Sequence, residues 1–119
     1  MILALAASFT CAVIQVHDGD TFRCADGTRV RVAGVDANEM NGTCHNVCAP
    51  MSAVKARDYA AGLILHQRIA CQPVGTSYKR VVARCTLPDG RSLSCALLAH
   101  GAAVRWDRYW KQYKMGRCE

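Results

Sequence analysis

Eight cysteines in 119 residues constrain this chain more strongly than any other feature of its sequence. They are even in number, they are spread over the whole length, and they form no CxxC pairs like those of zinc knuckles. In a small domain this pattern is typical of a disulfide framework, which persists in oxidising compartments. The alternative is a cytosolic protein with eight buried, reduced thiols. Because eight cysteines allow many pairings, the sequence leaves their connectivity open.

The length and charge of the chain set further limits. A chain of 119 residues, 51% of them apolar, suits one compact domain with a single core. Its net charge of +6 favours an anionic partner such as nucleic acid, although the same charge merely keeps many proteins soluble. The apolar runs are shorter than the roughly 18 residues of a membrane span, so we expect no membrane partner. We also expect a monomer.

The first eight residues (MILALAAS) resemble the end of a signal peptide, because residues 4–6 (ALA) fit a small-x-small cleavage site. The apolar run is short, however, and no Lys or Arg precedes it. Residues 1–8 are therefore either the remnant of a signal peptide or part of the first strand. Together with the cysteines, this segment favours a secreted or periplasmic protein whose folded domain covers residues 9–119.

Alternation and turn signals predict five short strands. Asp26-Gly27 is a strong hairpin signal, and the RVRV segment after it alternates with period two. That period places Arg29 and Arg31 on one face and two valines on the other. Five short strands around a helix predict a small closed barrel of the OB type, an α+β fold, with a mixed α+β sandwich as the alternative. The strands are expected over residues 10–16, 21–24, 29–32, 68–72 and 80–87, with a loop over 37–49 and a turn over 75–77.

One long helix and one short helix are predicted. Pro50 suits the first position of a helix, where its missing N–H costs nothing, and the apolar period continues to about Leu65. Ser94 is a candidate cap for a short helix that runs through Leu98 and ends at Gly101. The expected core positions of the long helix are Val54, Ala60, Ala61, Leu63 and Ile64.

The C-terminal segment has four aromatic residues at the helical spacing i, i+3, i+4 and i+7, with basic residues between them. Aromatics at this spacing usually belong to a core, so we favour a helix that packs these side chains on the barrel. The alternative is that they stack on the bases of a single strand while the basic residues contact its phosphates. The four aromatics are Trp106, Tyr109, Trp110 and Tyr113.

Four carboxylates stand in two groups that a meander can bring together. Asp18 and Asp20 flank a glycine in a tight turn, and Asp36 and Glu39 follow the third strand. Convergent carboxylates repel one another unless a cation neutralises them, and hard divalent ions prefer oxygen ligands. Calcium or magnesium is therefore the expected bound ion, and the spacing of the acids does not distinguish between them. A DGD turn by itself more often bonds its carboxylates to nearby backbone N–H groups.

Arg31 is a candidate phosphate-binding group near these acids, because it precedes Asp36 by five residues on the same strand. A guanidinium binds two phosphoryl oxygens at once, a metal binds a third, and one free carboxylate takes a proton from water. The plain alternative is a surface arginine paired with a carboxylate.

The four histidines are expected to be ordinary polar residues, although Cys44, His45 and Cys48 superficially resemble a metal clip. The histidines are His17, His45, His66 and His100.

Three segments together resemble the signatures of the staphylococcal nuclease (thermonuclease) family, which read DGDT, R-x-x-x-x-D-x-x-E and YGR. They are residues 18–21 (DGDT), 31–39 (RVAGVDANE) and 78–80 (YKR). Their order and intervals agree with the family, and the resemblance covers about residues 9–106. It implies an OB-fold nuclease that hydrolyses DNA, RNA or both and binds calcium at its active site.

The resemblance also implies a role for each matching residue. Asp20 and Asp36 would ligate calcium, with Asp18 in the outer shell of the ion. Glu39 would be the general base that activates the attacking water. The phosphate would be held by Arg31 and Arg80, which stabilise the transition state, and Tyr78 would lie beside the nucleotide. Attack in line with the departing 5′-oxygen would leave 3′-phosphate ends.

Two substitutions depart from the family pattern. Asn38 stands where the family often has proline, so the loop that carries Glu39 is expected to be less rigid. Lys79 replaces the glycine of YGR, so a turn that needs a positive φ at this position would be strained. The C-terminal segment is shorter than that of the prototype, and Cys118 is a candidate to pin it by a disulfide.

Two other functions compete with a nuclease. One is a non-catalytic nucleic-acid- or protein-binding module on the same barrel, but such degenerate copies typically lose the acids and arginines that this chain keeps. The other is a disulfide-rich extracellular binding domain with an accidental motif match, which predicts no metal dependence and no phosphate affinity.

Overall fold

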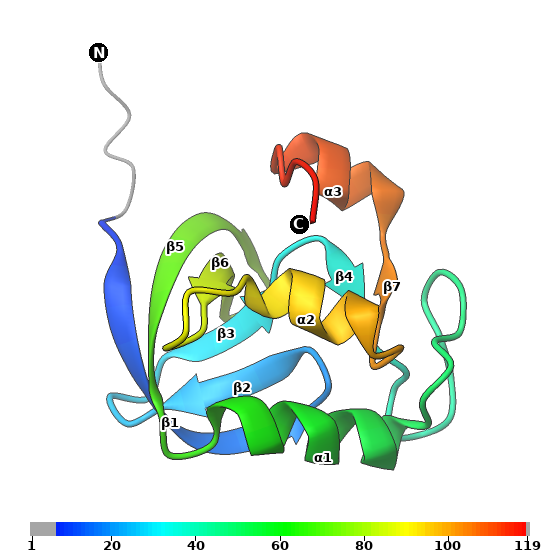
Figure 1. Ribbon diagram of the computed structural model, residues 1–119, viewed down its shortest axis with the longest axis horizontal. Helices are drawn as coiled ribbons and strands as arrows, with labels where there is room; N and C mark the ends of the chain where they lie inside the picture. The colour runs from blue at the N-terminus through cyan, green and yellow to red at the C-terminus, as the bar shows by residue number, and fades with distance from the viewer. Residues whose placement is uncertain (1–6, 119) are drawn as a thin grey trace.

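The computed structural model describes residues 7–118. Residues 1–6 of the expected signal-peptide segment lie outside the described residues, and the first strand begins at Phe9. Five strands close into a barrel in the order β1-β2-β3-β6-β5, and a separate two-stranded sheet joins β4 to β7 (Figure 1). The barrel strands are β1 (Phe9–Asp18), β2 (Thr21–Cys24), β3 (Arg29–Val32), β5 (Arg68–Ser77) and β6 (Arg80–Thr86), and the short sheet has β4 (Val35–Asp36) and β7 (Val104–Arg105).

The pairing pattern makes this an OB-like α+β barrel, as the sequence predicts. Strands β1, β2 and β3 form the antiparallel meander, and β3 then pairs in parallel with β6 to close the barrel. Helix α1 lies along β1, and α2 lies against β6 (Figure 1). The helices are α1 (Ala53–Ile64), α2 (Leu93–Ala99) and α3 (Asp107–Gln112). Within the described residues, no helix has the length and apolar character that a membrane crossing needs.

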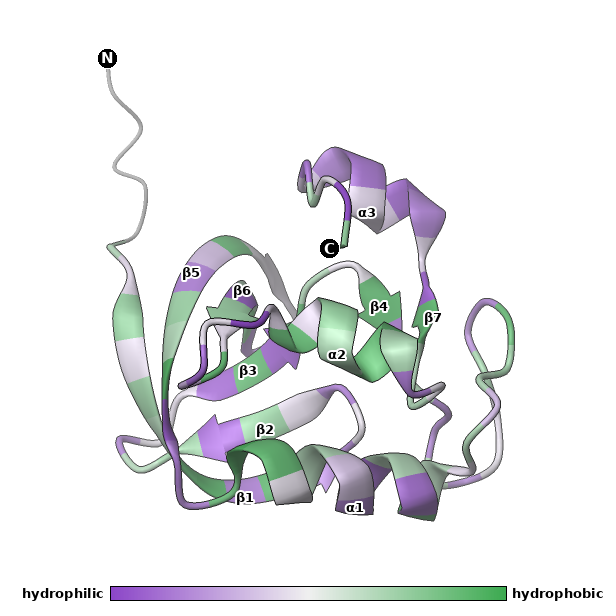
Figure 2. Ribbon diagram, viewed as in Figure 1, coloured by the Kyte–Doolittle hydropathy of each residue, from purple (hydrophilic) through white to green (hydrophobic). Residues whose placement is uncertain are grey.

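The core follows from the period-two alternation of the strands. In β3, Val30 and Val32 are buried, whereas Arg29 is exposed and Arg31 is partly exposed on the opposite face. The barrel interior is closed by apolar side chains of the helices, including Ile64. Figure 2 shows the same division, with hydrophobic residues on α2 and mainly hydrophilic ones on α3. The alternation thus turns Arg31 away from the core and toward the site described below.

All eight cysteines form disulfides, which confirms the predicted framework and indicates an oxidising environment. Two bonds brace neighbouring strands of the barrel, a third closes a small loop after β4, and the fourth ties the C-terminal tail to α2. The last bond confirms the expected pinning by Cys118. The pairs are Cys11–Cys24, Cys71–Cys85, Cys44–Cys48 and Cys95–Cys118.

The predicted start of the long helix was wrong. Helix α1 begins at Ala53, and Ser52 caps it by accepting a hydrogen bond from the backbone N–H of Lys55, 3.2 Å away. Pro50 lies outside the helix. Of the expected core positions, Ala60 and Ile64 are buried and Leu63 is partly buried, but Val54 is 50% exposed. Ala61 is only half-buried, and Ala56 takes a core position instead.

Two other boundaries also differ. Strand β5 continues through Ser77, so residues 75–77 are not a turn, because a bulge between Pro73 and Gly75 lets the pairing with β6 resume. Helix α2 is capped by Ser92 rather than Ser94. The Ser94 hydroxyl is buried and donates a hydrogen bond to the carbonyl of Ala33, 2.8 Å away. The predicted stop at Gly101 is confirmed, since this residue follows the helix with φ +76°.

Candidate active site

The turn between β1 and β2 is held close to the loop after β4. A Cβ on Gly19 would lie 2.9 Å from the Cβ atoms of both Ala37 and Ala56, so only glycine allows this approach. The Asp20 carboxylate accepts a hydrogen bond from the backbone N–H of Ala37, 2.8 Å from Oδ2. The backbone N–H of Asp20 also donates to Asp18 Oδ1 at 3.2 Å. The structure therefore brings together the two acidic segments that the meander was expected to join.

Arg31 lies among these carboxylates. Its Nη1 atom is 3.3 Å from Asp20 Oδ2, and its Nη2 atom is 3.4 Å from Asp36 Oδ1. The guanidinium also donates to the carbonyl oxygens of Val32 and Val35 at 3.0 and 2.8 Å. Because both carboxylates are at most 4% exposed, the guanidinium offsets much of the cost of burying their charge.

Arg80 joins the same network through Thr21. The Arg80 Nη1 atom donates to the Thr21 hydroxyl at 3.3 Å, and that hydroxyl donates to Asp20 Oδ1 at 3.1 Å. Two further bonds to Ser77 hold the Arg80 side chain. Tyr78 lies at the rim, where its ring is 95% exposed and its centroid is 5.9 Å from the Arg80 guanidinium carbon. The threonine of DGDT thus links Arg80 to Asp20, which in turn contacts Arg31. The sequence analysis gave this threonine no role.

Glu39 lies in the loop after β4, on the other side of Asp36. Its side chain is 32% exposed, and its Oε1 atom lies 3.3 Å from His45 Nδ1. The same His45 nitrogen is 3.3 Å from Asp36 Oδ1. Among the predicted site residues, Glu39 therefore reaches the others through His45, which the sequence analysis treated as an ordinary polar residue.

Asp18 is the carboxyl whose ionisation the site changes most. Its pKa is raised from the ordinary 3.8 to about 8, chiefly because the side chain is buried. The hydrogen-bonded and negatively charged carboxylate of Asp20 raises this pKa as well, and the charge of Glu39 adds a smaller effect in the same direction. Asp18 thus has a pKa well above the ordinary range of a carboxyl group.

The donor set suits a hard divalent cation. Asp36 is 1% exposed, yet its Oδ2 atom is buried without a hydrogen-bond partner among residues 7–118. A buried carboxylate oxygen without a donor is costly, and a bound cation is one ligand that would satisfy it. Within the same residues, no group of three or more His, Cys, Asp or Glu side chains is spaced to hold a metal. Two carboxylates are nevertheless compatible with calcium, which also takes backbone carbonyls and water as ligands.

A cavity of about 430 Å³ opens beside the arginines. The predicted packing of the C-terminal aromatics on the barrel is seen for Trp110, which is buried, and for Tyr113, whose ring lies against Gly75 of β5. Trp106, Tyr109 and Tyr113 are only partly buried and line the cavity. Trp106 packs edge-on against Tyr109, whose ring stacks on that of Tyr113 at 5.9 Å. Three of the four aromatics thus form a wall that faces Arg31 and Arg80 across the cavity.

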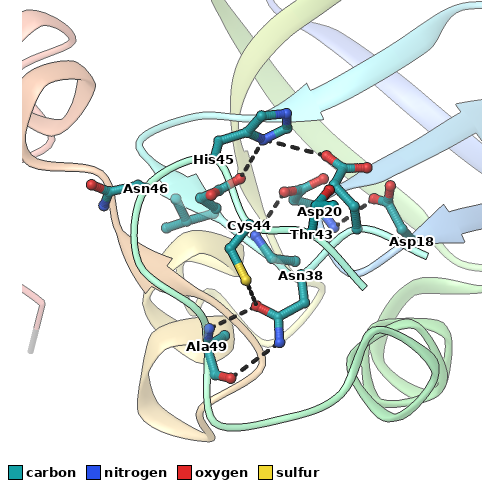
Figure 3. A network of polar contacts seen from close by, with 12 residues as sticks. Asp18, Asp20, Asn38, Thr43, Cys44, His45, Asn46 and Ala49 are labelled. Carbon is teal, nitrogen blue, oxygen red and sulfur yellow. Dashed lines mark hydrogen bonds and ion pairs between the residues drawn. The ribbon is translucent and has the colours of Figure 1, made fainter. Parts of the chain in front are cut away.

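The two departures from the motif are accommodated differently. The Asn38 amide donates to the carbonyls of Ala49 and Met51 at 3.1 and 2.9 Å, and its oxygen accepts from the N–H of Ala49 at 2.7 Å. These bonds fasten the base of the loop that was expected to be less rigid (Figure 3). The expected strain does not fall on Lys79, because the positive φ of this turn, 56°, is at Tyr78.

Comparison of the chain with protein-family models and with curated protein sequences finds no match.

The residues that sequence reasoning missed are Thr21 and His45. Thr21 was visible as the last residue of DGDT. For His45 the signal was its place directly after Cys44, in the loop that the disulfide to Cys48 closes, where the imidazole lies 3.3 Å from Asp36.

Proposed function

We propose that this chain is a secreted, calcium-dependent phosphodiesterase that resembles the staphylococcal nuclease family and hydrolyses DNA, RNA or both. One observation carries the proposal. Arg80, Thr21, Asp20, Arg31 and Asp36 form a continuous polar network beside a 430 Å³ cavity. These five residues come from β2, β3, β4, β6 and the turn before β2, so the fold, rather than chain proximity, assembles phosphate-binding groups next to acids.

The arginines supply the electrostatics that phosphodiester hydrolysis needs. Negative charge develops on the phosphoryl oxygens in the transition state, and guanidinium groups bind such oxygens in pairs. Arg31 and Arg80 both line the cavity, where a phosphate can reach them. Arg31 would exchange part of its contact with the carboxylates for contact with the phosphate.

Asp20 and Asp36 would hold the calcium ion, with Asp18 in its outer shell. When bound, the ion supplies a Lewis acid that neutralises charge on the phosphate. Of the four carboxylates predicted in the site, Glu39 is the most exposed. It would take a proton from the attacking water as general base. Water attacks phosphorus in line with the leaving 5′-oxygen, so the products carry 3′-phosphate and 5′-hydroxyl ends.

The surroundings of the site support a nucleic-acid substrate. The net charge of +6 attracts a polyanion, and the aromatic wall of Trp106, Tyr109 and Tyr113 offers flat faces on which bases stack. Four disulfides suit a protein that works outside the cell. The competing proposal is a non-catalytic binding module on the same barrel, which the aromatic wall suits equally well.

The ends of the products distinguish these proposals. The oxidised protein is incubated with single-stranded DNA and RNA oligonucleotides in calcium, in magnesium and in chelator, and the products are weighed by mass spectrometry. A nuclease gives fragments with 3′-phosphate ends in calcium and none in chelator, and Arg80→Gln gives far fewer. A binding module retards the oligonucleotides in a gel and leaves them intact in every buffer.

A further inference from the structure

The short loop closed by the Cys44–Cys48 disulfide places one imidazole against two carboxylates. His45 is the first residue inside this loop. Its Nδ1 atom lies at hydrogen-bond distance, 3.3 Å, from Asp36 Oδ1 and at an ion-pair distance of 3.3 Å from Glu39 Oε1. None of the three motif segments contains His45, so the contact is a property of this chain and its loop.

Two restraints act on the loop that carries His45 and one acts on its ring, although the side chain is 53% exposed. The disulfide closes the loop across only four residues of separation. Asn38 fastens the base of the loop through Ala49, and its oxygen also lies 3.6 Å from the Cys44 sulfur. On the side of the cavity, the imidazole stacks on the Trp106 ring, with centroids 5.9 Å apart and planes inclined by 12°. A side chain whose loop is closed by a covalent bond and whose ring stacks on a neighbour can orient another side chain.

Glu39 itself needs such an orienting contact. Its carboxylate is on a loop and is partly exposed, so the side chain has rotamers that turn it away from the phosphate. A general base works only within hydrogen-bond reach of the water that it deprotonates. The Nδ1 atom makes its hydrogen bond to Asp36 Oδ1. Its position 3.3 Å from Glu39 Oε1 favours rotamers that keep Oε1 beside the imidazole and leave Oε2 free for the water. Two carboxylates around Nδ1 favour the tautomer that carries its proton on this nitrogen.

We propose that His45 is a positioning residue that aims the Glu39 carboxylate, and that the Cys44–Cys48 disulfide and Trp106 hold the imidazole for this task. The inference rests on the proposed nuclease function. His45 acts through Glu39 rather than on the substrate, so its removal lowers kcat and leaves substrate binding to the arginines and the aromatic wall.

The test compares three variants with the parent in steady-state cleavage of a single-stranded oligonucleotide in calcium. His45→Ala is expected to lower kcat about tenfold or more with little change in KM, because misplacing a reacting group by about 1 Å can cost 10²-fold. His45→Asn keeps an amide N–H near the position of Nδ1 and is expected to recover most of kcat. Val47→Ala is the matched control, since this residue is in the same loop and is 61% exposed.

A double-mutant cycle with Glu39→Gln separates positioning from general damage. If His45 acts through Glu39, His45→Ala adds no further loss of kcat in the Glu39→Gln background, and thermal unfolding of the variants shows intact folds. Equal losses in His45→Ala and His45→Asn, an unchanged kcat in His45→Ala, or full additivity with Glu39→Gln would each overturn the positioning role alone. A folded parent that cuts nothing overturns the proposed function and this inference together.

Discussion

The guanidinium of Arg31 lies 3.3 Å from the carboxylate of Asp20, although eleven positions separate the two residues in the chain. Strand β2 and the following hairpin return the chain so that β3 runs beside the DGD turn. The arginine therefore offsets the buried charge of Asp20. In the proposed nuclease, it would become available to a phosphate when a cation takes over that role.

Arg31→Gln is expected to reduce stability in chelator by about 3 kcal/mol, because removing one partner of a buried ion pair leaves the other charge uncompensated. Calcium is expected to recover much of this loss, since the ion neutralises the same carboxylates. Chemical denaturation with calcium and with chelator measures both effects. A loss that is equal in the two buffers would contradict the shared role of Arg31 and the ion.

Asp18→Asn is expected to stabilise the calcium-free protein near pH 8. Because the folded pKa of Asp18 is about 8 against an ordinary 3.8, the folded state binds more protons than the unfolded state between these values. The contribution of Asp18 to stability therefore falls as pH rises from about 4 to 8 and then levels off. Melting curves in chelator should show a parent Tm that declines relative to Asp18→Asn across this window. Parallel curves would contradict the raised pKa.

Thr21→Val tests the link between the two arginines. The substitution removes the hydroxyl that accepts from Arg80 and donates to Asp20, so a buried carboxylate oxygen loses its donor. A destabilisation of about 1–3 kcal/mol is expected, together with a lower kcat/KM. Thr21→Ser retains the hydroxyl and serves as the control. If the valine and serine variants behaved alike, the hydroxyl would not be the link.

Removing the tail disulfide by Cys95→Ser with Cys118→Ser tests the aromatic wall. The bond closes a separation of 23 residues, so its loss is expected to cost about 3 kcal/mol and to free the end of the chain after α3. The KM for single-stranded DNA should rise, because Tyr109 and Tyr113 line the cavity, whereas kcat at saturation should change little. An unchanged KM in the folded variant would exclude the wall from substrate binding.

Much of the fold was predictable because it depends on local patterns. Alternation in β3 and the turn at Asp26-Gly27 predicted the hairpin, and the expected three-strand meander predicted the approach of the two acidic segments. The start of α1 was missed because Pro50 and Ser52 are both acceptable near a helix N-terminus, and only the bond to Lys55 decides between them. The end of β5 was missed because a bulge, which leaves no simple signature, absorbs Gly75.

The parts of the site that were missed depend on contacts between distant segments. The aromatics of the wall were expected in the core, because aromatics at helical spacing usually pack there. Helical spacing alone does not show which face of the segment meets the barrel. Helix α3 has only six residues, and only Trp110 turns inward. His45 was missed because its contact with Asp36 joins a loop to a strand, and the sequence leaves open both the conformation of that loop and its Cys44–Cys48 pairing.

The central claim is that Glu39 activates water in a calcium-dependent nuclease. The most direct test assays the parent and Glu39→Gln on single-stranded DNA and RNA, with calcium and with a chelator. We predict that the parent cuts only with calcium and that Glu39→Gln loses roughly 10²–10⁴-fold in rate, as removal of a general base does. A folded, oxidised parent that cuts nothing with calcium or magnesium would contradict the account and identify the barrel as a binding module.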